Sequence, residues 1–573
     1  MQSVHLFLLI LSLFLSIKCQ NKSASADQNL LAVCTTNTAE GLQSKPGPDG
    51  RFAPLFEDLG NLTYPINTNS PDAQRYFDQG MMLAYGFNHA EAARSFREAL
   101  RRDPECVMCY WGLGWVLGPN YNAGMEKEVL STALEAIANA KMRLQNTNPK
   151  EQALVKALDQ RYPPDLDTDP QPYYLAFAQA MREVKQAYPD DVTILLITAE
   201  ALMNLHPWDL WEKDGRAKPW TSEILALAEE ALQLSPNHPQ GLHIYIHAYE
   251  AGNQPEKAIP QAQKLEYLIP GSGHLVHMPS HIYINTGHFH EGAEANERAV
   301  KVDSAYVETC HAAGIYPLAY YPHNWHFLAA CAALEGKGRR AVEASRYMAD
   351  YTVDKNLLRE PGLGTLQHYY MIPAYIMVKF ARWDEILREP MPADDLLYPR
   401  GILHYARGMA LANQQNIPAA QLELKELERI ASIDSMQKIT IWDINSVAEL
   451  LHIARFALRG EIAFKQNKFA EAIKHYQKAV ELEDKLNYNE PPDWFFSLRH
   501  PLGHVLLQAG KYREAEQVFR QDLTEFKNNG WALQGLYRAL LKQKKDVEAD
   551  KVMELYQEAW KYADQELKSS VIM

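Results

Sequence analysis

Two pairs of histidines are the strongest chemical signal in the sequence. His243 and His247 are four residues apart, and His277 and His281 repeat that spacing about 34 residues later. Residues four apart share one face of a helix. Neutral imidazole is a common ligand for zinc, copper, iron and nickel, so each pair presents two metal ligands together. The pattern indicates a metal site if the two pairs lie on neighbouring helices.

Further candidate ligands lie near these pairs. Glu250 follows His247 by three residues, His274 lies one helical turn before the second pair, and His326 occupies a leading position in a later helix. A ligating imidazole usually donates its other N–H group to a carboxylate or carbonyl. We therefore expect Glu250, His274 and His326 to form the edge or outer shell of a site for Zn, Cu or Fe.

A binding groove without metal is the alternative interpretation. In that case the stacked histidines and nearby aromatic residues form a hydrogen-bond network or grip a peptide. A second His-x-x-x-His pair occurs late in the chain, and tryptophans lie near its start. The candidate groove residues are Trp111, Trp115, Tyr245, Tyr283, His323, His500 and His504.

Cys106 and Cys109 form a Cys-x-x-Cys motif. Tyr110 follows it, so the haem-attachment pattern, which needs histidine there, fails. A zinc ribbon would need a second such motif, and the sequence has none. We interpret the two cysteines as small residues that pack between helices, with a disulfide or a metal site as the alternatives.

Small residues recur at offsets that predict paired helices. Gly80 is followed by Ala92, Phe96 and Ala99 at offsets of 12, 16 and 19, and Gly114 comes about 34 residues after Gly80. The same offsets return in a late segment with Gly460, Ala472, Tyr476 and Ala479, and in part with Gly503, Ala515 and Phe519. Apolar residues keep helical spacing elsewhere, and strand signals are nearly absent.

This pattern resembles the tetratricopeptide repeat (TPR), a helix-turn-helix unit of about 34 residues. The phrases FNHAEAARSFREAL, HMPSHIYI and EPPDW look like those of long exported bacterial TPR proteins. The resemblance implies an all-α, right-handed solenoid of about eleven to twelve repeats between Gln74 and Ala563. It also implies that the first helix of each repeat lines a concave groove, where a protein or peptide partner binds.

The chain divides into six expected segments. These are a signal peptide (1–20), a polar tether and irregular segment (21–70), an N-terminal TPR array (71–302), an insertion (303–322), a C-terminal TPR array (323–566) and a tail (567–573). A second irregularity, residues 206–222, lengthens a turn and carries three tryptophans. Insertions in repeat arrays often form one binding face.

Composition narrows the function classes. The 573 residues carry 57 Lys and Arg against 71 Asp and Glu, a net charge of -14, which argues against a nucleic-acid binder. No mature segment has the roughly 20 apolar residues of a transmembrane span. The apolar N-terminus predicts export to the periplasm, the outside or the outer membrane, the last through a lipid anchor on Cys19.

The sequence therefore predicts an exported solenoid that binds a partner protein, peptide or small ligand in a groove rich in histidine and aromatic residues. The alternative is a metal-binding protein or metal-dependent enzyme that uses the clustered histidines. No phosphate-binding loop, Gly-x-Ser-x-Gly or His-Glu-x-x-His motif is present. Whether the protein is an enzyme stays open.

Overall fold

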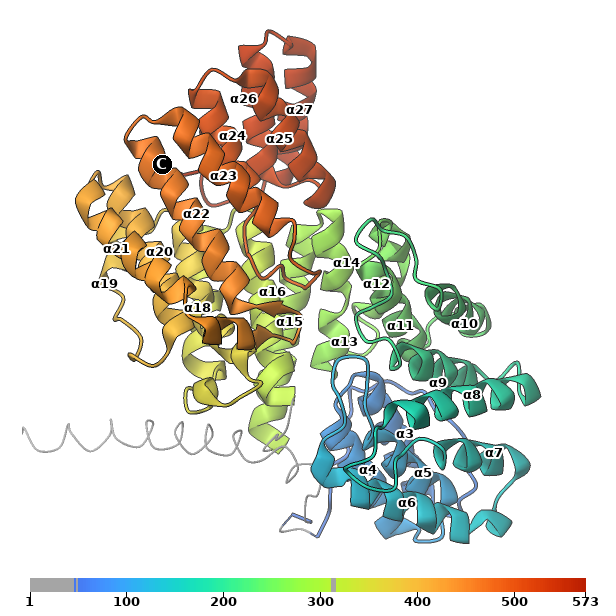
Figure 1. The fold of residues 1–573 in the computed structure, drawn as a ribbon. Coiled ribbons are helices and arrows are strands. Elements are labelled where there is room, and N and C mark those ends of the chain that lie inside the picture. Colours follow the sequence, from blue (N-terminus) through green and yellow to red (C-terminus); the bar gives the residue numbers. More distant parts are fainter. Residues whose placement is uncertain (1–45, 48–49, 311–315, 573) are drawn as a thin grey trace, which may run out of the picture.

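The computed structural model describes residues 46–47, 50–310 and 316–572. These residues form an all-α fold of packed helix pairs, as the repeated offsets predict (Figure 1). The only strands in the described part of the chain are β1 (Thr440–Ile441) and β2 (Asn445–Ser446), which pair antiparallel. The predicted fold class is confirmed. The predicted signal peptide, Cys19 and most of the predicted tether lie outside the described residues.

The N-terminal half contains thirteen helices among the described residues. They are α3 (Pro71–Tyr85), α4 (His89–Arg102), α5 (Val107–Val116), α6 (Leu130–Met142), α7 (Pro149–Leu158), α8 (Gln171–Ala187), α9 (Val192–Met203), α10 (Thr221–Leu234), α11 (Pro239–Glu250), α12 (Ile259–Leu265), α13 (Gly273–His277), α14 (Pro279–Thr286) and α15 (Phe289–Cys310). Consecutive helices make most of the contacts, as expected of a repeat array.

The C-terminal half continues in the same way. Its described helices are α16 (Tyr321–Leu334), α17 (Gly338–Tyr347), α18 (Gly364–Lys379), α19 (Trp383–Arg388), α20 (Leu397–Asn413), α21 (Ile417–Ala431), α22 (Val447–Lys465), α23 (Phe469–Glu483), α24 (Arg499–Gln508), α25 (Tyr512–Glu525), α26 (Gly530–Lys542) and α27 (Asp546–Ala559). Short π-helical turns occupy Tyr316–Tyr320 and Met348–Thr352.

Local signals explain where individual helices begin. The Ser70 side chain accepts a hydrogen bond from the Ala73 amide, and Pro71 opens helix α3. A serine cap occurs again later in the chain, since Ser446 and Glu449 form a reciprocal capping box at the start of α22. Both devices satisfy amide groups that lack a partner within the helix.

Glycines let the paired helices approach closely. A Cβ atom on Gly80 would lie 2.7 Å from the Phe96 ring, and one on Gly112 would lie 2.4 Å from it. Phe96 in α4 thus packs against α3 of its own repeat and α5 of the next. Late in the array, Phe519 packs in the same way against Gly503 and Gly535. The recurring packing unit is therefore one ring between two glycines.

The structure departs from the predicted segments at two places. Residues 303–310 of the predicted insertion continue helix α15, and residues 316–320 lead directly into α16. The predicted helix that carries His277 and His281 is divided, because Pro279 lacks an amide proton and begins a new helix, α14. The two histidines consequently lie on consecutive short helices.

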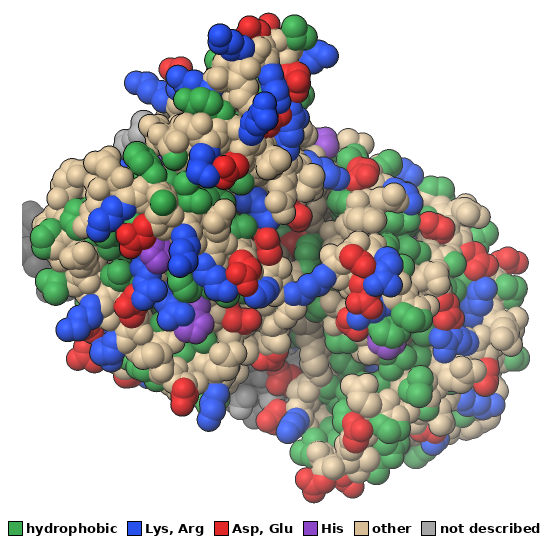
Figure 2. Space-filling model, turned by 45° about the horizontal axis from the view of Figure 1, so that its top comes forward, with side chains coloured by type: hydrophobic (Ala, Val, Ile, Leu, Met, Phe, Trp, Pro, Cys, Tyr) green, Lys and Arg blue, Asp and Glu red, His purple; other side chains and the backbone are tan. Residues whose placement is uncertain are grey.

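The buried core falls into two parts that meet at helices α13 to α16. One apolar cluster extends from Leu59 to Tyr320, and the other extends from Ile284 to Leu567. In Figure 1 these helices lie between the blue-green and the yellow-red halves of the molecule. Figure 2 shows acidic and basic side chains interspersed over one face. None of the described helices is long and apolar enough to span a membrane.

Candidate metal centre: two histidine triads

A first histidine triad lies between helices α11 and α13. It consists of His243 and His247 from α11 and His274 from α13, and each offers a ring nitrogen within 4.8 Å of the other two. The Nε2 atoms of His243 and His274 are 3.2 Å apart. Two nitrogen ligands of one tetrahedral zinc ion lie roughly 3–3.5 Å apart, since each Zn–N bond is about 2.0–2.1 Å. This spacing suits a single ion.

A second triad lies directly beside the first. His277 from α13, His281 from α14 and His323 from α16 again place one ring nitrogen each within 4.8 Å of the others. The Nε2 atoms of His277 and His281 are 2.9 Å apart. The pairs predicted from the 34-residue register are thus brought together, but each pair gains a third histidine from another helix.

Hydrogen bonds at the far side of the rings set the tautomers. The Nδ1–H group of His243 donates to the Tyr85 carbonyl at 2.7 Å, and that of His247 donates to Glu250 at 2.9 Å. The Nδ1–H group of His277 donates to the amide oxygen of Asn296 at 2.7 Å. Carbonyl, amide and carboxylate oxygens accept only, so in the neutral rings the Nε2 lone pairs remain free for a metal.

Glu250 links the two triads electrostatically. Its carboxylate lies 2.9 Å from Nδ1 of His247 in the first triad and 2.9 Å from Nδ1 of His281 in the second. Glu490, from the loop before α24, also pairs with His281 Nδ1. Both carboxylates are buried. Two acidic groups behind the rings compensate the positive charge that metal ions would bring into this interior.

These carboxylates set the protonation of His281. Burial alone would lower the pKa of His281, but Glu250 and Glu490 raise it to about 10. Burial raises the pKa of Glu490 to about 7 despite the nearby His281. Burial would raise the pKa of Glu250 as well, yet His247 and His281 lower it to about 2. His281 is therefore an imidazolium in the metal-free centre.

Four of the other rings are neutral. Burial, and next the neighbouring imidazoles, lower the pKa of His243, His274, His277 and His323 well below the usual value. Three buried ring nitrogens of the triads have neither a hydrogen bond nor an ion pair in the described part of the chain: Nε2 of His247, Nδ1 of His274 and Nδ1 of His323. Buried polar atoms of proteins are normally satisfied. Each triad therefore has at least one ring nitrogen that still lacks a partner.

A phenylalanine ring packs against each triad. Phe87 lies 4.5 Å from the ring of His243, and Phe327 lies 4.6 Å from the ring of His281. Phe87 occupies a turn position with a φ of 55°, where equivalent turns carry Gly287, Gly336 or Gly510, or a non-aromatic residue such as Gln415 or Lys544. A bulky residue is disfavoured there. Its presence in that turn places an apolar ring over the first triad.

The lengthened turn at residues 206–222 covers the same triad from another side. Trp208 stacks on Tyr121 at 5.3 Å, and both rings lie within 6 Å of the His247 ring. Five of the six triad histidines are at most 2% exposed, and His323 is partly exposed. The centre is thus largely buried, and His323 on α16 is its most exposed ring.

The comparisons with known proteins identify the repeats. A tetratricopeptide repeat family model matches residues 71–117, and another matches residues 455–486. The chain contains tetratricopeptide repeats. The TPR segments matched are those in which Phe96 and Tyr476 pack against glycines. No curated protein matches the chain.

Solved TPR structures resemble the chain at low identity. The human IFIT1 dimer with m7Gppp-AAAA is 14% identical, with 87% of this chain and 92% of that chain covered and a TM-score of 0.31. The APC/C hetero-tetramer Cut9-Hcn1 is 14% identical, with 88% and 76% covered and a TM-score of 0.28. Yeast Tom70 is 12% identical, with 84% and 92% covered and a TM-score of 0.28.

Several predicted site residues lie apart from the two triads. His326 stacks on Phe495 at 5.2 Å and packs near His368 and Tyr369, outside the second triad. Trp111 and Trp115 are buried and stack on each other at 5.5 Å. Tyr245 is buried beside Tyr249, and Tyr283 donates to Glu266. Their helices bury both faces, so these aromatic residues pack between repeats instead of lining an open groove.

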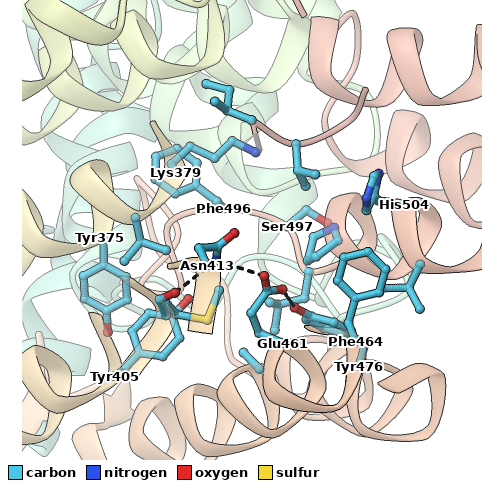
Figure 3. Close-up of a pocket in the computed structure, with 18 of the residues that line it drawn as sticks. Tyr375, Lys379, Tyr405, Asn413, Glu461, Phe464, Tyr476, Phe496, Ser497 and His504 are labelled. Atoms are coloured by element: carbon cyan, nitrogen blue, oxygen red, sulfur yellow. Dashed lines mark hydrogen bonds between the residues drawn. The ribbon is translucent and has the colours of Figure 1, made fainter. Parts of the chain in front are cut away.

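His500 and His504 lie in α24, and His504 lines a separate cavity of about 100 Å³ (Figure 3). His500 Nε2 is 2.9 Å from Asp522, and its Nδ1 is 2.8 Å from the amine of Lys379. His504 Nδ1 is 2.7 Å from Ser569 Oγ, so the tail contributes to the cavity wall. This pair does not approach the triads.

Cys106 and Cys109 form a disulfide, which is one of the alternatives that the sequence left open. No sequence signal pointed to Glu490, Asn296 or Phe87 at the centre. Glu490 lies in the phrase EPPDW, far beyond His281 in the chain. A pattern based on the 34-residue period has no means of finding a residue from a loop between repeats.

Proposed function

We propose that this TPR protein binds two transition-metal ions, one in each histidine triad. The observation that carries the proposal is the convergence of three imidazole nitrogens in each triad, within 4.8 Å of one another. The Nδ1 contacts to Tyr85, Glu250 and Asn296 support it, because such outer contacts orient metal-ligating histidines.

The ligand types narrow the choice of metal. All six ligands are imidazoles, which suit zinc and copper, and neither triad includes a thiolate. Non-haem iron sites typically combine two histidines with a carboxylate. Glu250 and Glu490 contact Nδ1 of the rings, on the side away from the shared nitrogens, and serve as outer groups. Copper and zinc are therefore the ions proposed.

Metal analysis of protein purified without a His tag tests the proposal. The wild-type chain, reconstituted with excess copper or zinc and then desalted, is expected to retain about two ions. Changing His243 and His247 together to alanine should leave one ion, as should changing His277 and His281. A His475→Ala variant, altered on the surface of α23, should retain both ions. Background metal in the reconstituted wild type would overturn the proposal.

Binding of a peptide is a second function that one observation favours. Residues 567–572 lie against α24 and α26: Gln534 donates to the Leu567 carbonyl at 2.6 Å, and Ser570 donates to the His500 carbonyl at 2.8 Å. We propose that this surface accepts an extended peptide. A labelled peptide of residues 566–572 should bind saturably to a chain that ends at residue 565. Absence of binding to a chain that remains helical would refute this role.

We also propose that the protein is exported, either with residues 1–20 removed or with a lipid on Cys19. The apolar N-terminal segment supports export, and so does the Cys106–Cys109 disulfide, because disulfides persist mainly in oxidising compartments. The intact mass of the native protein decides between cleavage and lipidation. An unprocessed chain in the cytosolic fraction would contradict both.

A further inference from the structure

The two triads face each other closely enough to act as one unit. The ring centroids of His247 and His281 are 5.8 Å apart, and those of His274 and His277 are 5.9 Å apart. Within the triads the centroid separations range from 4.7 to 6.4 Å. The distance between triads is therefore the same as the distance inside one. Two ions held there would share a single small bridging ligand.

The described surroundings offer no basic side chain to help such a pair hold an anionic substrate. Two-metal sites that process phosphate esters use cations to hold the charged group. In the described part of the chain, no lysine or arginine forms a hydrogen bond or an ion pair with any of the six histidines. The fixed charges next to the rings are Glu250 and Glu490, which repel anions.

The lining favours a small, uncharged ligand. Phe87 and Phe327 lie at opposite ends of the centre, each within 6 Å of three histidine rings. Trp208 and Tyr121 exclude water from the first triad. A buried site with aromatic rings packed against both triads suits a diatomic molecule better than a peptide or a sugar.

We infer that the two triads hold a pair of copper ions that binds dioxygen between them. This inference rests on the proposed function, because it requires both triads to be occupied. Imidazole ligands bind copper in both its oxidation states. Each Cu(I) ion gives one electron, so dioxygen gains two and reaches the peroxide level while both ions become Cu(II). No proton or further reductant is needed, and release of dioxygen restores two Cu(I) ions.

The test uses copper(I) and dioxygen as the only probes. Tag-free full-length protein is loaded with Cu(I) without oxygen, desalted, analysed for copper and then mixed with oxygenated buffer. An oxygen electrode should record one dioxygen per two bound copper ions. The product should give almost no paramagnetic resonance signal, because two bridged Cu(II) ions couple. Protein loaded with zinc, which has no accessible redox change, should take up none.

Variants separate the pair from a single ion. His323→Gln removes a ligand of the second triad only, and its expected result is one tightly held copper with at least a tenfold loss of dioxygen uptake. His475→Ala is the matched surface control and should behave as wild type. Helicity by circular dichroism confirms that each variant is folded, and the wild-type stoichiometry decides the question even if a variant unfolds.

The outcomes distinguish the two proposals. Two bound coppers without dioxygen uptake, or with the full signal of isolated Cu(II), would overturn the dioxygen inference and leave the metal-binding function intact. Failure to bind copper or zinc at all would refute the proposed function and the inference together. Two coppers with one dioxygen and a silent spectrum would establish both.

Discussion

Replacing Asp303 by asparagine should make the metal-free protein progressively more stable than the wild type as the pH rises. Asp303 in α15 is fully buried, accepts a hydrogen bond from the Tyr316 hydroxyl at 2.8 Å and accepts another from the Asn324 amide at 2.6 Å. Burial raises the pKa of Asp303 to about 7 from its usual 3.8, although both hydrogen bonds lower it. The buried surroundings of Asp303 therefore favour its neutral, protonated form.

The size of the effect follows from the two pKa values. Between pH 3.8 and about 7 the folded chain keeps a proton that the unfolded chain has released, so stability falls as the pH rises. The penalty is about 1.7 kcal/mol at pH 5 and about 4.3 kcal/mol at pH 8, given about 1.4 kcal/mol per pKa unit. Asparagine does not ionise and escapes this penalty.

The altered hydrogen bonds of residue 303 change the free energy of unfolding of the variant by the same amount at every pH. One oxygen of the Asp303 carboxylate accepts from Tyr316, and an asparagine oxygen accepts there equally well. The new amide group needs an acceptor, which Asn324 supplies after its own amide turns over, because its Oδ1 atom is buried without a partner. This rearrangement changes the free energy of unfolding by about 1 kcal/mol and does not depend on pH.

Urea unfolding of both proteins, with a chelator present, measures the difference at several pH values. The free energy of unfolding of Asp303→Asn minus that of the wild type should grow by about 2.6 kcal/mol between pH 5 and pH 8. Asp169→Asn, at an exposed acid, is the control and should show no such trend. A difference for Asp303→Asn that stays flat or shrinks over this range would refute the reasoning.

Two further predictions follow from close contacts in the structure. Glu250→Gln keeps the shape of a side chain that contacts one ring of each triad but removes its charge. Copper affinity, measured by equilibrium dialysis, should fall roughly 10–100-fold at both sites. Glu335→Gln changes a carboxylate that pairs with His290 away from the triads, and should leave copper affinity unchanged. Gly503→Ala would place a Cβ atom 2.2 Å from the Phe519 ring and should lower the free energy of unfolding by about 1–3 kcal/mol. Alanine at Gly124, where no atom lies within 4 Å, should change it by less than about 0.5 kcal/mol.

The sequence was sufficient to predict the helical pairs, because their packing recurs in the chain. An aromatic ring packs against a glycine of the preceding helix in several repeats, so the pair Gly80 and Phe96 returns as Gly460 and Tyr476. The contact with the next repeat was less visible. Phe96 also packs against Gly112, whereas the repeat period counted from Gly80 points to Gly114. The contact between Phe96 and Gly112 depends on how the two repeats pack together, which the 34-residue period does not specify.

The candidate site was predictable only where it follows the repeat. The 34-residue register placed His243, His247, His277 and His281 on adjacent repeats, and the structure brings these four together. The sequence predicted both His274 and His326 at the edge of the metal site. In the structure His274 joins the first triad, whereas His326 packs against Phe495. The break at Pro279 and the course of α16 decide that difference, and neither is visible as a period.

The division into two triads, instead of one cluster of four, follows from the third ring that each pair gains. His274, at the start of α13, meets His243 of the first pair. His277 and His281 meet each other across Pro279, and His323 from α16 joins them. The two added rings therefore turn a repeated His-x-x-x-His face into two adjacent sites, and the loop with Glu490 supplies a second carboxylate beside the nearer one.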